Sequence, residues 1–295
     1  MKTHTRERAY VSTTFAPDGT ELAEVLELCR DQGIRRVELG SNHAPVADPL
    51  KVLARFDFEY LAHNYFPIPK EPFVLNVASL DDRIRERSVT HVLEAIDFCA
   101  TADVGLYTFH PGFVTDPKGA NKDASNYDFQ FEAKRLAEAN YEAAFARMMA
   151  SLETAVAHAA KRRVRVAIET EGSVTKPDHL LMQRPSELRR LIERFDPDEL
   201  GINLNLGHLL LASNAFHFPM QELVSVVADH VVAMELSHNA GAHDEHQPLR
   251  QDGWYWDLIR DPRFERAYKI LEFRNAAVGD ILANLSWLQA PPAAR

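Results

Sequence analysis

Six side chains that can bind a cation or move a proton stand at or near the ends of short apolar runs of sequence. They are Glu38, His63, His110, Glu169, Glu235 and Glu272. Each alone has an ordinary explanation, because a strand-end carboxylate is commonly a solvated cap and a lone histidine is commonly hydrogen-bonded structure. In a parallel barrel the carboxyl ends of all strands meet at one mouth, so these residues would share one site. Together they predict a single metal-binding or acid–base centre.

Two local motifs add candidates to this centre. In segment 201–208, two asparagines alternate with apolar residues, so both amides lie on one side of a strand, and a histidine follows. In segment 235–246, a strand runs into a loop with three more histidines, where an Asp-x-His spacing lets two side chains reach one ion. Such loops also occur on plain surfaces. The metal-ligand candidates from these motifs are Asn205, His208, Asp244 and His246.

Short apolar runs alternate with longer segments of helical periodicity along the whole chain. The expected strands are 10–16, 36–39, 60–64, 104–110, 164–169, 201–206, 231–236 and 268–273. The expected helices are 21–32, 50–56, 79–99, 131–162, 185–192, 220–228 and 278–288. Eight alternations without a linker favour one α/β domain over residues 1–295, a (β/α)8 TIM barrel, rather than two doubly wound sheets.

Composition narrows the class of protein. A net charge of −10 leaves no basic footprint for a nucleic-acid backbone, so nucleic acid is an unlikely partner. No apolar run is long enough to span a bilayer, and the polar start does not resemble a secretory signal, so we expect a cytoplasmic protein without a membrane partner. Cys29 and Cys99 lie in helical segments and are expected to be buried thiols. A homo-oligomer is compatible with the sequence.

A series of short motifs runs along nearly the whole chain, and their order and spacing are more specific than any one of them. They are segments 62–66, 73–79 and 109–112, Ile168-Glu169, segments 205–208 and 244–246, and Leu271-Glu272. In these motifs the chain resembles the xylose-isomerase-like TIM barrels, a family that includes sugar isomerases, epimerases and apurinic endonucleases of the second family.

The endonuclease-like branch of this family implies a set of metal ligands. They are His63, His110, Glu169, His208, Asp244, His246 and Glu272. Two positions depart from the family pattern, because Asn205 stands where an aspartate is usual and Glu235 stands where a histidine is usual. The formal charge is unchanged while one nitrogen ligand becomes oxygen, which favours Mn²⁺ or Mg²⁺, or leaves Fe²⁺ or Zn²⁺ in an altered site. The number of ions, one to three, stays open.

The isomerase-like reaction would use one divalent ion held by Glu169, His208 or Asn205, Glu235 and Glu272. The ion would polarise a sugar carbonyl, and Glu169 and Glu272 would exchange a proton at the neighbouring carbon as the catalytic pair. Further substrate contacts are expected from Arg274 and Asn275, which would hold a phosphate or carboxylate, and from His63 and His110. The residues expected to wall the pocket are Trp254, Trp256, Phe66 and Phe113.

Two other functions are alternatives to isomerisation of a small-molecule carbohydrate substrate. Metal-assisted phosphodiester hydrolysis would use clustered ions and is supported by His63, His110, Asp244 and His246. Against it, the stretch 40–49 has no arginine or lysine with which to grip DNA, so DNA affinity should be poor. A barrel that binds metal without turnover is disfavoured by the general-base candidates Glu169 and Glu272. The sequence therefore favours sugar isomerisation or epimerisation.

Overall fold

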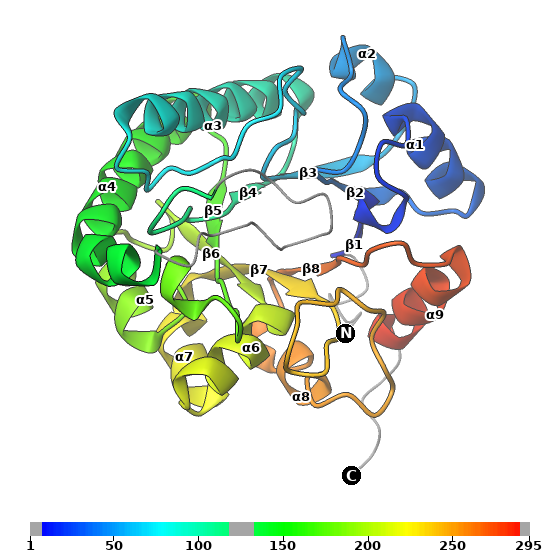
Figure 1. Cartoon of the computed structure of the whole chain (residues 1–295). Coiled ribbons are helices and arrows are strands. Elements are labelled where there is room, and N and C mark those ends of the chain that lie inside the picture. Colours follow the sequence, from blue (N-terminus) through cyan, green and yellow to red (C-terminus); the bar gives the residue numbers. More distant parts are fainter. Residues whose placement is uncertain (1–7, 118–132, 290–295) are drawn as a thin grey trace.

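The chain forms a closed barrel of eight parallel strands in sequence order, with helices outside the ring (Figure 1). The computed structural model describes residues 8–117 and 133–289, apart from the side chains of 133–137. The strands are β1 (Ala9–Ser12), β2 (Arg36–Leu39), β3 (Glu59–His63), β4 (Tyr107–Phe109), β5 (Val166–Glu169), β6 (Gly201–Asn205), β7 (Val231–Leu236) and β8 (Tyr268–Leu271). The ring closes where β1 pairs with β8, so the predicted (β/α)8 barrel is confirmed.

The helices follow the strands around the outside of the ring. They are α1 (Leu22–Asp31), α2 (Pro49–Leu53), α3 (Asp82–Ala102), α4 (Ala133–Arg162), α5 (Pro185–Ile192), α6 (Leu206–Phe216), α7 (Met220–Val227), α8 (Trp256–Ile259) and α9 (Val278–Gln289). Their apolar faces pack against the barrel, and both Cys29 on α1 and Cys99 on α3 are buried free thiols, as expected. Within the described residues, no helix combines the length and apolarity needed to cross a bilayer.

Every second residue of a strand points into the barrel, because successive strand residues face opposite sides. These inward side chains form two layers. The lower layer is an apolar cluster of Tyr10, Leu61, Leu106, Ala167, Ala233 and Ile270. Two residues further along these and the neighbouring strands, the inward positions become polar and remain buried. They are Ser12, Glu38, His63, Thr108, Glu169, Asn203, Glu235 and Glu272. The apolar plug closes the barrel from below, so this polar layer forms a floor at the carboxyl ends of the strands.

The elements differ from the sequence expectation at several places, among them the unexpected short helix α8 and the strands β4 and β5, which begin two or three residues later than expected. The first strand ends at Ser12, and the rest of the predicted run forms a short 3-10 helix over Thr13–Phe15. Helix α6 was not expected; it begins immediately after β6 because the Asn205 side chain caps it by accepting the backbone N–H of His208. The expected start of the helix 131–162 lies outside the described residues, and the described part begins at Ala133.

Candidate active site

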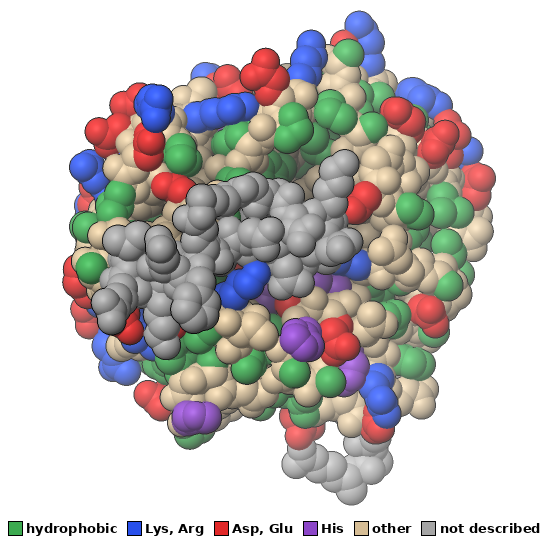
Figure 2. All heavy atoms as spheres, viewed as in Figure 1, with side chains coloured by type: hydrophobic (Ala, Val, Ile, Leu, Met, Phe, Trp, Pro, Cys, Tyr) green, Lys and Arg blue, Asp and Glu red, His purple; other side chains and the backbone are tan. Residues whose placement is uncertain are grey.

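A cavity of about 810 Å³ opens above the polar floor of the barrel. Most of the residues predicted from the sequence line it: His63, His110, Glu169, His208, Asp244, His246, Glu272, Arg274 and Asn275. The strands and loops that supply these residues are far apart in the sequence, and the barrel closure brings their carboxyl ends together. On the face that Figure 2 shows, several histidine side chains gather near the centre.

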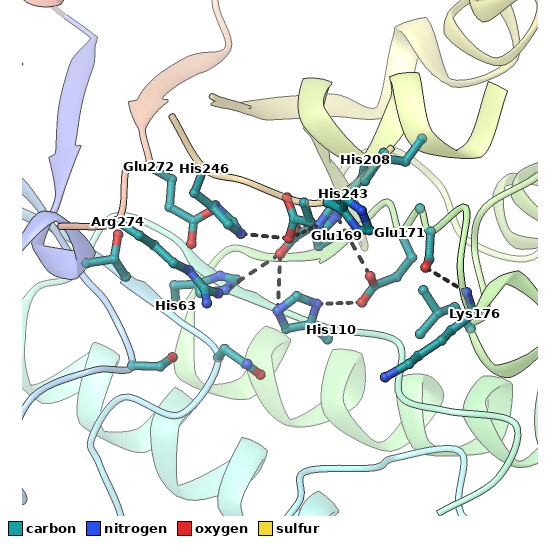
Figure 3. A pocket seen from close by; sticks show the side chains of 18 of the residues that line it. His63, His110, Glu169, Glu171, Lys176, His208, His243, His246, Glu272 and Arg274 are labelled. Carbon is teal, nitrogen blue, oxygen red and sulfur yellow. Dashed lines mark hydrogen bonds and ion pairs between the residues drawn. The ribbon is translucent and has the colours of Figure 1, made fainter. Parts of the chain in front are cut away.

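One group of ligands converges on a single carboxylate oxygen. Oε2 of Glu169 lies 3.6 Å from Nε2 of His63 and 3.6 Å from Nε2 of His110. Among the described residues this buried oxygen has no hydrogen-bond partner. The three side chains offer atoms within 4.8 Å of one another, a spacing that suits ligands of one cation (Figure 3). This carboxylate oxygen and these imidazoles therefore fit a divalent metal ion.

A second group adjoins Glu169 through His208, whose Nδ1 lies 3.2 Å from Oε1 of Glu169. Oδ2 of Asp244 is 2.7 Å from Nε2 of His246 and 3.3 Å from Nε2 of His208. Nδ1 of His208 lies 2.9 Å from the carbonyl oxygen of Thr170, which only accepts hydrogen bonds. The ring therefore carries its proton on Nδ1 and, when neutral, keeps the Nε2 lone pair for a cation, the arrangement typical of a metal ligand held by a second hydrogen bond.

Two predicted ligands lie beneath the cavity rather than on its wall. Asn205 donates from Nδ2 to Oε1 of Glu169 at 2.9 Å and to Oε2 of Glu235 at 3.0 Å. Its amide oxygen accepts the N–H of His208 at 3.0 Å. With both ends of its amide engaged, Asn205 positions the two carboxylates and the start of α6. Glu235 is 1% exposed and is bridged by Asn205 to the Glu169 centre.

The sequence analysis missed Glu171. Its Oε1 lies 2.6 Å from Nδ1 of His110, and its Oε2 lies 3.7 Å from Nδ1 of His208. A carboxylate that holds the far nitrogen of a histidine orients the ring and directs its other nitrogen toward a metal. The sequence could have indicated this residue. Glu171 follows Glu169 by two residues, and in an extended segment side chains two residues apart point to the same side.

The wall of the cavity differs from the expectation for aromatic residues. Phe113 lines it, as expected. Phe66 instead packs against Phe98 of α3 with ring centroids 5.5 Å apart, and Trp256 packs against Trp287 of α9 at 6.5 Å. Trp254 packs against the outer core and is likewise absent from the described cavity lining. Phe66 and Trp256 are thus buried against the outer helices, and Trp254 is half-buried beside Tyr255.

The charges of the site are strongly coupled. Burial alone would lower the pKa of His110, but the Glu169 and Glu171 carboxylates outweigh it and raise that pKa to about 9. Burial would likewise lower the pKa of His246, but Asp244 and Glu272 raise it to about 9. Burial would raise the pKa of Glu272, yet the His246 imidazole outweighs this and holds it at about 2. Without a cation the site is thus a set of imidazolium–carboxylate pairs, and a metal must displace protons to bind.

Buried carboxylates and imidazoles at the strand ends of a barrel, around one cavity, form an arrangement that could hold a divalent cation beside a bound substrate. Residues 9–290 match the family model described as "Xylose isomerase-like TIM barrel". The chain belongs to this family.

One sequence relative and two solved structures match the chain over nearly its whole length. An uncharacterized protein of Methanocaldococcus jannaschii, MJ1614, is 25% identical over 276 residues, covering 92% of this chain and 94% of the relative. A D-tagatose 3-epimerase-like protein matches with a TM-score of 0.69 and 19% identity over 96% of each chain. Endonuclease IV from Thermus thermophilus matches with a TM-score of 0.60 and 14% identity, over 96% of this chain and 97% of that one. These two structural matches show the shared fold.

Proposed function

We propose that this protein is a divalent-metal-dependent isomerase or epimerase of a small carbohydrate. The observation that carries the proposal is the placement of two buried carboxylates, Glu169 and Glu272, on the lining of one cavity beside imidazoles able to hold a cation. The two carboxylates come from β5 and from the end of β8, which are three strands apart in the ring. Each can therefore meet a bound sugar from a different side.

The residues present fit a divalent ion. Oε2 of Glu169 and Oδ1 of Asp244 are buried and lack a hydrogen-bond partner among the described residues. The groups that would hold an ion are His63 with His110 and Glu169, and His208 with Asp244 and His246. The ion would supply Lewis-acid polarisation of a sugar carbonyl, which acidifies the hydrogen on the neighbouring carbon.

The chain's own carboxylates would then move the proton. One carboxylate accepts the proton from the carbon next to the carbonyl, which leaves an enediolate. The other carboxylate, which has taken up a proton from water, returns it to the opposite face of the same carbon, or to the former carbonyl carbon while the hydroxyl proton passes between the two oxygens. The first outcome inverts a hydroxyl-bearing centre and the second exchanges an aldose with a ketose. Because Glu169 and Glu272 stand on two sides of the ring of strands, they favour delivery of the proton to the opposite face of the carbon, and hence epimerisation.

The far part of the cavity suits an oxygen-rich substrate. Arg274 and Asn275 lie on the lining just beyond Glu272, and the backbone N–H of Arg274 donates to the carbonyl oxygen of His246 at 3.1 Å. This contact ties the guanidinium-bearing loop to the loop that carries Asp244 and His246. Arg274 would bind a substrate phosphate or carboxylate, and Asn275 would bind a hydroxyl.

Solvent exchange tests the proposed function directly. The protein, loaded with Mn²⁺ or Mg²⁺, is incubated in deuterated water with a panel of ketoses, aldoses and their phosphates, and carbon-bound deuterium is followed by NMR and mass spectrometry. Incorporation at one carbon beside the carbonyl is expected for the true substrate. If no sugar in the panel exchanges a proton while phosphodiesters are cleaved, the proposal is wrong.

A metal-dependent phosphodiesterase is the second candidate, because two separate ligand groups could each hold an ion and paired ions suit hydrolysis. The charge distribution argues against a nucleic-acid substrate. In Figure 2 acidic and basic side chains are interspersed around the rim. Of the described residues that line the cavity, the lysine and arginine residues are Lys176 and Arg274, against the five acidic residues Asp18, Glu169, Glu171, Asp244 and Glu272. A polyanion gains little from such a surface.

A further inference from the structure

A third group of ligand-type side chains lies deeper in the barrel than the two at the cavity. Glu38 of β2, His63 of β3 and Glu235 of β7 each offer an atom, and these atoms lie within 4.8 Å of one another. All three residues are buried, with exposed fractions of 0%, 3% and 1%. His63 lines the cavity whereas Glu38 and Glu235 do not, so the group reaches from the cavity floor into the polar layer beneath it.

Glu38 has no cationic partner for its charge among the described residues of this layer. Both of its carboxylate oxygens are buried without a well-aligned hydrogen bond, although the hydroxyl of Ser12 on β1 lies close enough to stabilise the ionised form. Within the part of the chain that the structure describes, no lysine or arginine forms an ion pair with Glu38 or Glu235. Leaving a carboxylate dry and unpaired is very costly, and even the protonated form loses a hydrogen bond. The chemistry of the group therefore calls for a positive partner.

A neighbouring amide supplies one more unused oxygen. Asn203 donates from Nδ2 to Oε1 of Glu235 at 2.5 Å, while its own Oδ1 is buried and without a hydrogen-bond partner among the described residues. Nδ1 of His63 lies 3.6 Å from the same Oε1 of Glu235 and 2.8 Å from the hydroxyl oxygen of Thr108. Carboxylate, amide and hydroxyl oxygens with one imidazole are thus gathered at one depth of the barrel.

We propose that Glu38, His63 and Glu235 form a deep binding site for a divalent cation, distinct in position from the two ligand groups at the cavity and sharing only His63 with them. Two carboxylates and one neutral imidazole carry a net charge of −2, which matches the ion. Two oxygen donors and one nitrogen donor suit Mn²⁺, Fe²⁺ or Zn²⁺ better than Ca²⁺. The site depends on Glu235, because a histidine at that position would remove one of its two negative charges.

The deep site shares His63 with the group formed by His110 and Glu169. A neutral imidazole has a single lone pair, so His63 serves one ion at a time. The deep position and the cavity position that uses His63 are consequently filled as alternatives. An ion in the deep site is kept away from the substrate. An ion held by His63, His110 and Glu169 instead lies on the lining of the cavity, where it can contact the substrate. The His208–Asp244–His246 group shares no ligand with the deep site and is independent of this competition.

Anomalous diffraction from crystals equilibrated with Mn²⁺ locates the ions without any substitution. An anomalous peak is expected about 2–2.6 Å from oxygens of Glu38 and Glu235. In crystals of Glu38→Gln this peak should disappear while the peak at Asp244 stays. In His110→Ala the deep peak should grow, because the competing position loses a ligand. Crystals of His110→Ala at saturating Mn²⁺ with density at Asp244 and none between Glu38 and Glu235 would overturn the proposal.

Ion counting in solution provides a second measurement. In the His110→Ala background, adding Glu38→Gln should lower the Mn²⁺ bound after equilibrium dialysis by about one ion per chain. The matched control is Glu59→Gln in the same background, which removes a carboxylate at the opposite end of the barrel, beside Tyr10, and should leave the count unchanged. Equal counts in the two double variants would contradict the deep site. Neither measurement uses a sugar, so failure of the proposed reaction and failure of the deep site are distinguishable.

Discussion

Replacement of Glu272 by glutamine tests the proposed proton transfer at its central residue. Glu272 is 5% exposed, lines the cavity, and has Oε2 3.1 Å from Nδ1 of His246. Because its pKa is held at about 2, it is ionised at neutral pH and ready to accept a proton. Glutamine keeps the shape and one oxygen but removes the charge and the ability to take up a proton.

The expected loss follows from the contribution of a positioned general base. Such a base contributes a factor of ~100 to 10,000, which corresponds to about 3–5 kcal/mol of transition-state stabilisation. We therefore expect Glu272→Gln to exchange protons between a bound sugar and deuterated solvent ~100- to 10,000-fold more slowly than the parent at saturating metal. Circular dichroism and thermal unfolding should show a folded barrel.

Metal titration separates a base from a ligand. Glu272 also contacts His246, so the substitution can weaken metal binding as well as proton transfer. Activity that returns as the metal concentration rises indicates a ligand alone, whereas a loss that persists at saturation indicates a base. Glu171→Gln is the matched control, because Glu171 orients His110 and should act mainly through metal affinity. If Glu272→Gln at saturating metal exchanges protons as fast as the parent, the mechanism is refuted.

Four further outcomes are expected. Incision of duplex DNA with an abasic site should be negligible, and efficient metal-dependent cleavage at low enzyme concentration would reverse the preference for a sugar. Affinity for Mn²⁺, measured by calorimetry, should rise as the pH increases toward about 9, because the cation competes with protons on His110 and His246; a flat profile would argue against imidazole ligands. Asn205→Ala removes the cap of α6 and should lower the free energy of unfolding in urea by ~0.5–2 kcal/mol; an unchanged midpoint would contradict this. Burial lowers the pKa of Lys269 from 10.5 to about 8, so its charged form is penalised below that pH and the penalty is relieved as the pH rises. The parent should therefore gain ~1–2 kcal/mol relative to Lys269→Met between about pH 8 and 9.5, and a constant difference in urea unfolding would be inconsistent with that titration.

The sequence by itself was sufficient for the fold and for much of the cavity lining. Apolar runs of strand length alternate with helical segments, and eight such alternations without a linker are typical of a closed parallel barrel. Because strand ends meet at one mouth of such a barrel, residues such as His63, Glu169 and Glu272 could be assigned to one site without knowledge of their distances. Local periodicity carries this information.

Only the tertiary structure decided which of these residues contact one another and at what depth. Neighbouring strands align Ser12 with Glu38 and Asn205 with Glu235, and this register places both glutamates under the cavity rather than on its wall. The same closure brings Glu171 against His110, 61 residues earlier in the chain. Pairing across the barrel depends on strand register and closure, which arise from the packing of all eight strands together. No local pattern encodes them, so the sequence identified the candidate ligands and the fold grouped them.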